Sequence, residues 1–172
     1  LLGITPFDQP NVQAAKDATD RVLGGFERTG SLPPLEDQGS LTGLLSQAGA
    51  SDYLAIMAYL PGTQELADEL DRLRQRVMEK HRIATTLGYG PRFLHSTGQL
   101  HKGGPSSGLF LQITEDHPQD AAIPGRPYTF ATLVDAQAIG DYEALSSAGR
   151  RVARLRLDED AAGAVRKLAE SV

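Results

Sequence analysis

The densest group of chemically active side chains in this sequence lies in residues 93–105, FLHSTGQLHKGGP. This segment carries two histidines, a lysine, two hydroxyl side chains and a glutamine ahead of a Gly-Gly-Pro turn. Imidazole exchanges protons near neutral pH, and an ammonium group stabilises developing negative charge. Binding and catalytic groups concentrate in loops on a rigid scaffold, so we expect this segment to be a loop that carries the functional site.

Strand-like and helix-like patterns alternate around that segment. Apolar runs of strand length are followed by helical spacing of apolar residues, which predicts a three-layer α/β domain. The sheet is expected to be mainly parallel, with about four strands and helices on both faces. Ligands of such sheets bind beyond the carboxyl ends of the strands. The expected strands are 52–60, 83–87, 109–114 and 151–157, and the expected helices are 40–48, 64–81, 128–145 and 161–171.

The N-terminal part of the chain has a different character. Asp8 and Pro10 favour a helix start, and apolar spacing continues to about Phe26. Residues 29–39 contain two consecutive prolines and are polar and glycine-containing, which indicates a linker. We therefore expect an N-terminal helical arm at 1–28, a linker at 29–39 and a C-terminal α/β domain at 40–172. The start on Leu-Leu-Gly suggests the interior of a longer polypeptide.

Composition narrows the classes of function. The net charge of -5 and the lack of a basic stripe argue against nucleic acid as a partner. The absence of cysteine excludes disulfides and thiolate metal sites and fits a cytoplasmic location. No apolar run reaches membrane-spanning length, so no membrane partner is expected. The four histidines do not show metal-ligand spacing, and neither a dinucleotide fingerprint nor a serine-hydrolase motif is present.

Two stretches resemble phosphoglucose isomerases. Residues 6–12, PFDQPNV, with Lys16 on the helix that follows, are similar to the C-terminal signature of these enzymes. Residues 94–99, LHSTGQ, resemble the segment that holds their ring-opening histidine. The order of the two stretches is reversed relative to a plain isomerase. The unbroken run GYGPRFLHSTGQLHKGGP at 88–105 resembles bacterial bifunctional transaldolase/phosphoglucose isomerase fusions, and the likeness extends across most of residues 40–157.

The resemblance implies the C-terminal part of a cytoplasmic enzyme that interconverts glucose 6-phosphate and fructose 6-phosphate without a cofactor or metal. Residues 1–28 would then end the preceding isomerase domain, and the glutamate base would lie outside this chain, which alone would be inactive. The implied partners are the sugar phosphate and the upstream transaldolase and isomerase domains, and a homo-oligomer is left open. The implied catalytic residues are His95 and Lys16, and the candidate substrate-binding residues are Arg92, Ser96, Thr97, Gln99, His101 and Lys102.

The residue types alone leave other interpretations open. His95 could be a capping or core histidine, and Lys16 could be a solvated lysine on an amphipathic helix. His101 and Lys102 could line a turn or bind an anion at the glycine pair that follows them. Arg92 could bind a phosphate or an internal carboxylate. The alternative function is a non-catalytic module that binds sugar phosphate or docks the enzyme domains.

Overall fold

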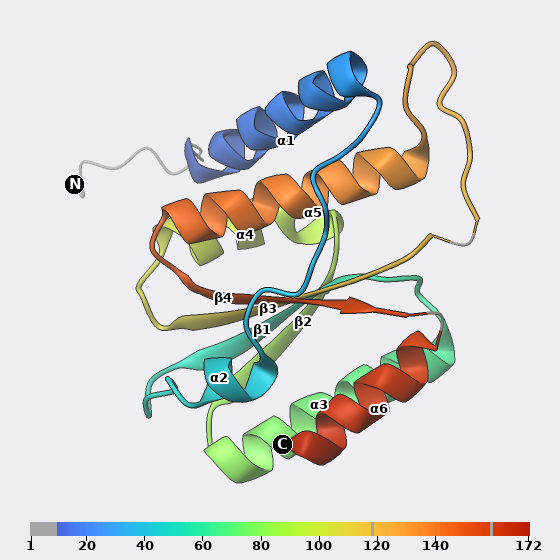
Figure 1. Cartoon of the computed structure of the whole chain (residues 1–172). Helices are drawn as coiled ribbons and strands as arrows, with labels where there is room; N and C mark the ends of the chain where they lie inside the picture. Colours follow the sequence, from blue (N-terminus) through green and yellow to red (C-terminus); the bar gives the residue numbers. More distant parts are fainter. Residues whose placement is uncertain (1–9, 118, 159) are drawn as a thin grey trace, which may run out of the picture.

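The computed structural model describes residues 10–117, 119–158 and 160–172, without the side chains of Leu94 and Ser96. Helices and strands alternate along most of the chain (Figure 1). The helices are α1 (Pro10–Thr29), α2 (Leu41–Leu45), α3 (Gln64–His81), η1 (Arg92–Leu94, a 3-10 turn), α4 (Ser96–Gly103), α5 (Phe130–Ser147) and α6 (Ala161–Ser171). The strands are β1 (Tyr53–Tyr59), β2 (Ala84–Tyr89), β3 (Gly108–Glu115) and β4 (Arg151–Leu157).

The four strands form one parallel sheet in the order β2-β1-β3-β4. Helices α3 and α6 cover one face of this sheet, and α1, α4 and α5 lie over the other (Figure 1). The chain runs from β1 outward to β2 and then returns past β1 to β3. The connections that leave β1 and β3 therefore diverge at the carboxyl edge of the sheet, which is where α/β sheets place their ligands.

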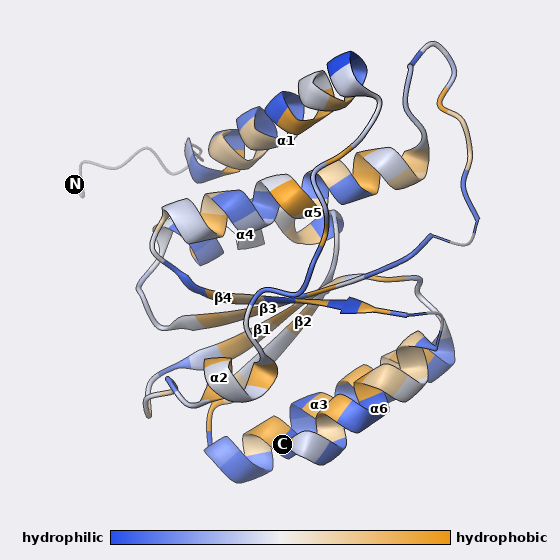
Figure 2. Ribbon diagram, in the orientation of Figure 1, coloured by the Kyte–Doolittle hydropathy of each residue, from blue (hydrophilic) through white to orange (hydrophobic). Residues whose placement is uncertain are grey.

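Burial explains why the two central strands are apolar throughout. Six of the seven residues of β1 and seven of the eight residues of β3 are buried, as expected for parallel strands covered on both faces. Figure 2 shows the apolar residues of α3 and α6 turned towards the sheet. Thr63 begins α3 by accepting a hydrogen bond from the Leu66 amide, and Arg82 ends it in the left-handed conformation.

Helix α1 packs closely along α5. Its buried face includes Val12, Ala15 and Val22. At Gly140 of α5, an added Cβ would lie only 2.7 Å from the Thr19 amide nitrogen, so only glycine allows this approach. The chain after α1 then crosses the sheet edge, where Gln38 pairs with Arg154 of β4 in an antiparallel bridge.

The structure confirms the predicted three-layer fold. Helices 64–81 and 161–171 and strand 151–157 have the expected bounds, and the other elements that were expected differ by a few residues at one or both ends. The expectation of a loop at 93–105 was wrong, because most of the segment forms η1 and α4. Glycine, serine and threonine disfavour helix interiors, but here the tertiary hydrogen bonds of α4 to Asn11 and Arg150 outweigh that preference.

No helix in the described part of the chain has the length and apolar character needed to cross a bilayer.

Candidate functional site

The main candidate site is a cavity of about 460 Å³ between α1, the β2–α4 connection and α5. Its polar lining comes from three separate parts of the chain. Lys16 and Asp20 come from α1, Arg92 and His95 come from the β2–α4 connection, and Gln137 comes from α5. The volume lies within the range of roughly 300–1,000 Å³ typical of small-molecule sites.

His95 stands at the first turn of α4. It is the N-cap residue, its backbone carbonyl accepts a hydrogen bond from the Gln99 amide at 3.0 Å, and its side chain is exposed. Its place after the carboxyl end of β2 carries it towards α1. Lys16 lies on the exposed side of α1 and lines the same cavity, so the structure brings the two predicted catalytic residues together.

Arg92 also faces this cavity. It lies in η1 and is exposed, with its guanidinium carbon 5.9 Å from the centre of the Tyr89 ring. Within the described residues no carboxylate pairs with Arg92, so its forked donors can serve an anionic ligand. That position favours the phosphate-binding interpretation over the internal carboxylate.

Gln99 has a different role from the one predicted. Its side-chain oxygen accepts a hydrogen bond of 2.9 Å from the backbone amide of Asn11, in the first turn of α1. It therefore ties α4 to α1 rather than facing the cavity. Thr97 is exposed on α4 outside the cavity lining, and the side chain of Ser96 lies outside the described residues.

His101 and Lys102 lie in the interior, on the side of α4 that packs against the rest of the domain. Each is 4% exposed. The His101 ring is surrounded by three aromatic rings, and its centroid is 4.9 Å from that of Phe110. Burial, with a smaller effect of Lys102, lowers the pKa of His101 to about 4. Their predicted substrate contact does not fit this position, because neither side chain reaches the cavity.

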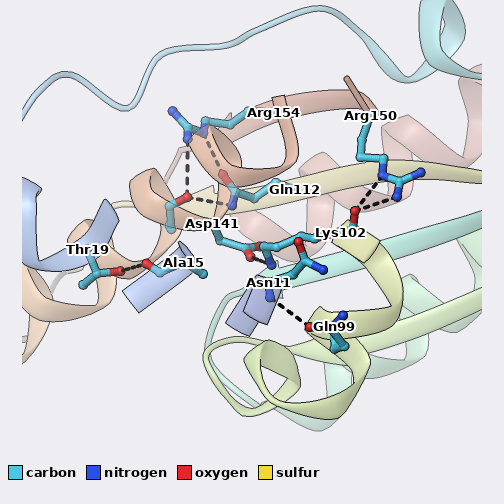
Figure 3. A network of polar contacts seen from close by, with 10 residues as sticks. Asn11, Ala15, Thr19, Gln99, Lys102, Gln112, Asp141, Arg150 and Arg154 are labelled. Carbon is cyan, nitrogen blue, oxygen red and sulfur yellow. Dashed lines mark hydrogen bonds and ion pairs between the residues drawn. The ribbon is translucent and has the colours of Figure 1, made fainter. Parts of the chain in front are cut away.

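Lys102 forms a buried ion pair with Asp141 of α5 (Figure 3). Burial raises the pKa of Asp141, and Lys102 and Arg154 oppose this effect. Next to the pair, the side-chain Nε2 of Gln112 on β3 donates to the Ala138 carbonyl at 2.9 Å, and Arg154 Nε donates to the side-chain Oε1 of Gln112 at 2.7 Å. Together these contacts fix α4 and α5 against the sheet.

A third attachment holds the C-terminal end of α4. Arg150 donates hydrogen bonds to the carbonyls of Lys102 and Gly104, at 2.5 and 2.7 Å from its Nη2 (Figure 3 shows the Lys102 contact). Carbonyls at the end of a helix have no partner within the helix, so a guanidinium suits this place. Helix α4 is thus anchored along its length, and the exposed side chain of His95 lies at its N-terminal end.

The chemistry of the cavity follows from its lining. An imidazole can exchange protons with hydroxyl and ring oxygens, and an ammonium and a guanidinium can hold anionic oxygens.

Sequence reasoning did not identify Asp20 or Gln137 as site residues. The spacing of Asp20, one helical turn after Lys16, is the signal that could have found it. Tyr128 is half-buried and also lines the cavity.

Metal binding has no support in the described residues, where no three acidic or histidine side chains lie close enough to hold an ion.

Comparison with known proteins shows the fold but not a family. No protein-family model and no curated protein matches the chain. A solved structure, that of the hypothetical protein TT0462 from Thermus thermophilus, superposes with a TM-score of 0.61 at 21% sequence identity. The match covers 94% of this chain and 42% of that protein, so this chain spans less than half of its length. At this identity the likeness concerns the architecture alone.

Proposed function

We propose that this chain provides the ring-opening and oxyanion-binding side of a hexose-phosphate isomerase site, acting on glucose 6-phosphate and fructose 6-phosphate. The observation that carries the proposal is the meeting of His95, Lys16 and Arg92 at one cavity. These residues come from segments about 80 positions apart, and two of them were selected by the resemblance to phosphoglucose isomerases. Their chemistry matches the requirements of the reaction.

In the proposed mechanism, His95 accepts the proton of the anomeric hydroxyl and returns it to the ring oxygen as the C1–O5 bond breaks. This gives the open aldehyde. The proton then moves between C2 and C1 through a carboxylate base, which the resemblance places outside this chain. The ammonium of Lys16 stabilises the enediolate formed in that step. Arg92 binds the phosphate with two parallel hydrogen bonds.

The test is turnover by the longer polypeptide that contains this chain. His95→Ala should lower kcat/KM on cyclic glucose 6-phosphate by about 100- to 10,000-fold, as for loss of a general acid–base group. Lys16→Ala should lower it by about 100- to 1,000-fold. His81→Ala and Lys167→Ala are matched controls, because α3 and α6 cover the other face of the sheet. Unchanged turnover in His95→Ala would refute the proposal.

The alternative is a non-catalytic module that binds sugar phosphate in the same cavity. The feature that favours it is the presence of two cations, Lys16 and Arg92, in a cavity for which no base for the C1–C2 proton transfer is assigned in this chain. Saturable binding of glucose 6-phosphate that is lost in Arg92→Ala, together with full turnover in His95→Ala, would support this function instead.

A further inference from the structure

The carboxyl edge of the sheet holds a second cavity, at the point where the connections from β1 and β3 diverge. It measures about 410 Å³. Leu60 and Pro61 follow β1, Gly90 follows β2, and Glu115 and His117 lie at the end of β3. This is the location at which open α/β sheets bind ligands. Val134 of α5 completes the apolar part of its lining.

This second cavity is distinct from the first. Among the described residues the two cavities share no lining side chain. The turn at 90–91 separates them, with Gly90 in the second cavity and Pro91 in the first. An inference about the second cavity therefore does not rest on the proposed isomerase function.

The His117 ring of the second cavity is oriented by a carboxylate that lies behind it, outside the cavity lining. His117 Nε2 lies 2.9 Å from Asp135 Oδ1 on α5, which fixes the ring and raises the pKa of His117. Burial raises the pKa of Glu115. A carboxylate beside a histidine is the arrangement that fixes the tautomer and orientation of an imidazole. The other ring nitrogen, Nδ1, is then the one that would contact a ligand.

The charged groups around Glu115 and His117 decide which class of ligand fits the second cavity. Asp116 raises the pKa of Glu115, and Asp135 and Glu115 raise that of His117. Arg156, the nearby cation, is engaged by Asp116. The surroundings therefore carry no surplus positive charge for a phosphate or carboxylate.

We infer that this second cavity binds a neutral polyhydroxyl compound, such as a cyclic sugar without a phosphate group. Hydroxyls of such a ligand can donate to Glu115 and form a hydrogen bond with His117 Nδ1. The C–H face of a sugar ring can cover the apolar side chains of Leu60, Pro61 and Val134. The combination of an apolar wall with a few convergent polar groups is typical of small-molecule sites.

The experiment is a titration of the full chain with methyl α-D-glucopyranoside, a neutral sugar whose ring cannot open, followed by the NMR signals of the histidine rings. The His117 signals should shift and saturate, and those of His95 should stay unchanged. Glu115→Gln should weaken binding at least tenfold in this titration, and His117→Gln should do so by calorimetry, since that variant lacks the His117 signal. The control variants Glu79→Gln and His81→Gln on α3 should bind as the wild type does.

Asp135→Asn tests the orientation of the ring separately. It should lower the pKa of His117 in the free protein and weaken binding. The absence of a saturable His117 shift in the wild type would overturn the inference, whatever the variants do. Equal binding by Glu115→Gln, or saturation by inorganic phosphate in place of the glucoside, would also overturn it. Because the glucoside is not an isomerase substrate, these results are independent of turnover.

Discussion

The buried His101 makes the stability of this domain depend on pH. Its pKa is about 4 in the folded protein and close to 6.5 in the unfolded chain. Between these two values the unfolded state binds more protons, so acidification destabilises the fold. At about 1.4 kcal/mol for each pKa unit, the whole effect is about 3 kcal/mol. About 2 kcal/mol of it should be lost between pH 7 and pH 4.5, and very little between pH 8 and pH 7.

The comparison of wild type with His101→Leu isolates this effect. Leucine cannot titrate, and it suits a site walled by Tyr53, Phe93 and Phe110. Urea unfolding at pH 7 should give the two proteins free energies of unfolding within about 1–2 kcal/mol of each other. As the pH falls to 4.5, the wild type should lose about 2 kcal/mol more than the variant.

The control for this prediction is His81→Leu at the end of α3, which should keep the pH dependence of the wild type. The difference between variant and wild type removes the contribution of His117, whose raised pKa acts in the opposite sense. That contribution is present at low pH and lost as the pH rises through the folded pKa of His117. Identical pH profiles for wild type and His101→Leu would refute the reasoning that burial keeps His101 neutral.

Three further substitutions test the packing around the site by urea unfolding at pH 7. Lys102→Met should lower the free energy of unfolding by about 3–5 kcal/mol, because it leaves the Asp141 carboxylate buried without its partner. Adding Asp141→Leu to that variant should recover most of the lost stability. Gly140→Ala should cost about 1–3 kcal/mol, since its methyl group would meet the Thr19 backbone, and a cost near zero would contradict the close packing of α1 on α5. Thr63→Ala should cost about 1 kcal/mol through loss of the α3 N-cap, whereas Thr63→Ser should keep the cap and most of the stability.

The elements with strong apolar periodicity could be predicted from sequence because their local signals agree with their burial. Helix α3 has a capping threonine at 63 and leucines at helical spacing, and both features are present in the structure. The apolar run that forms β1 is buried on both faces, as its composition indicates. In these segments local preference and tertiary packing favour the same structure.

The segment around the site could not be read in the same way, because α4 reverses the usual pattern of polar and apolar faces. Its polar residues His101 and Lys102 face the interior, whereas Leu100 is 54% exposed. Sequence gives no sign that Asp141, 39 positions away, compensates the charge of the buried lysine. The sequence therefore could not distinguish His95, His101 and Lys102 as candidate site residues. Only the fold shows that His95 is exposed and that the other two are buried.

This burial has a consequence for the exposed part of the site. The first turn of α4 is tied to α1 through Gln99 and Asn11, and its last turn is tied to α5 through Lys102 and Asp141. A buried ion pair adds little net stability over apolar packing, but it is satisfied in only one arrangement of its two helices. The pair thus fixes the position of α4 between α1 and α5. Because His95 begins α4, the same contacts hold its imidazole at the cavity that it shares with α1.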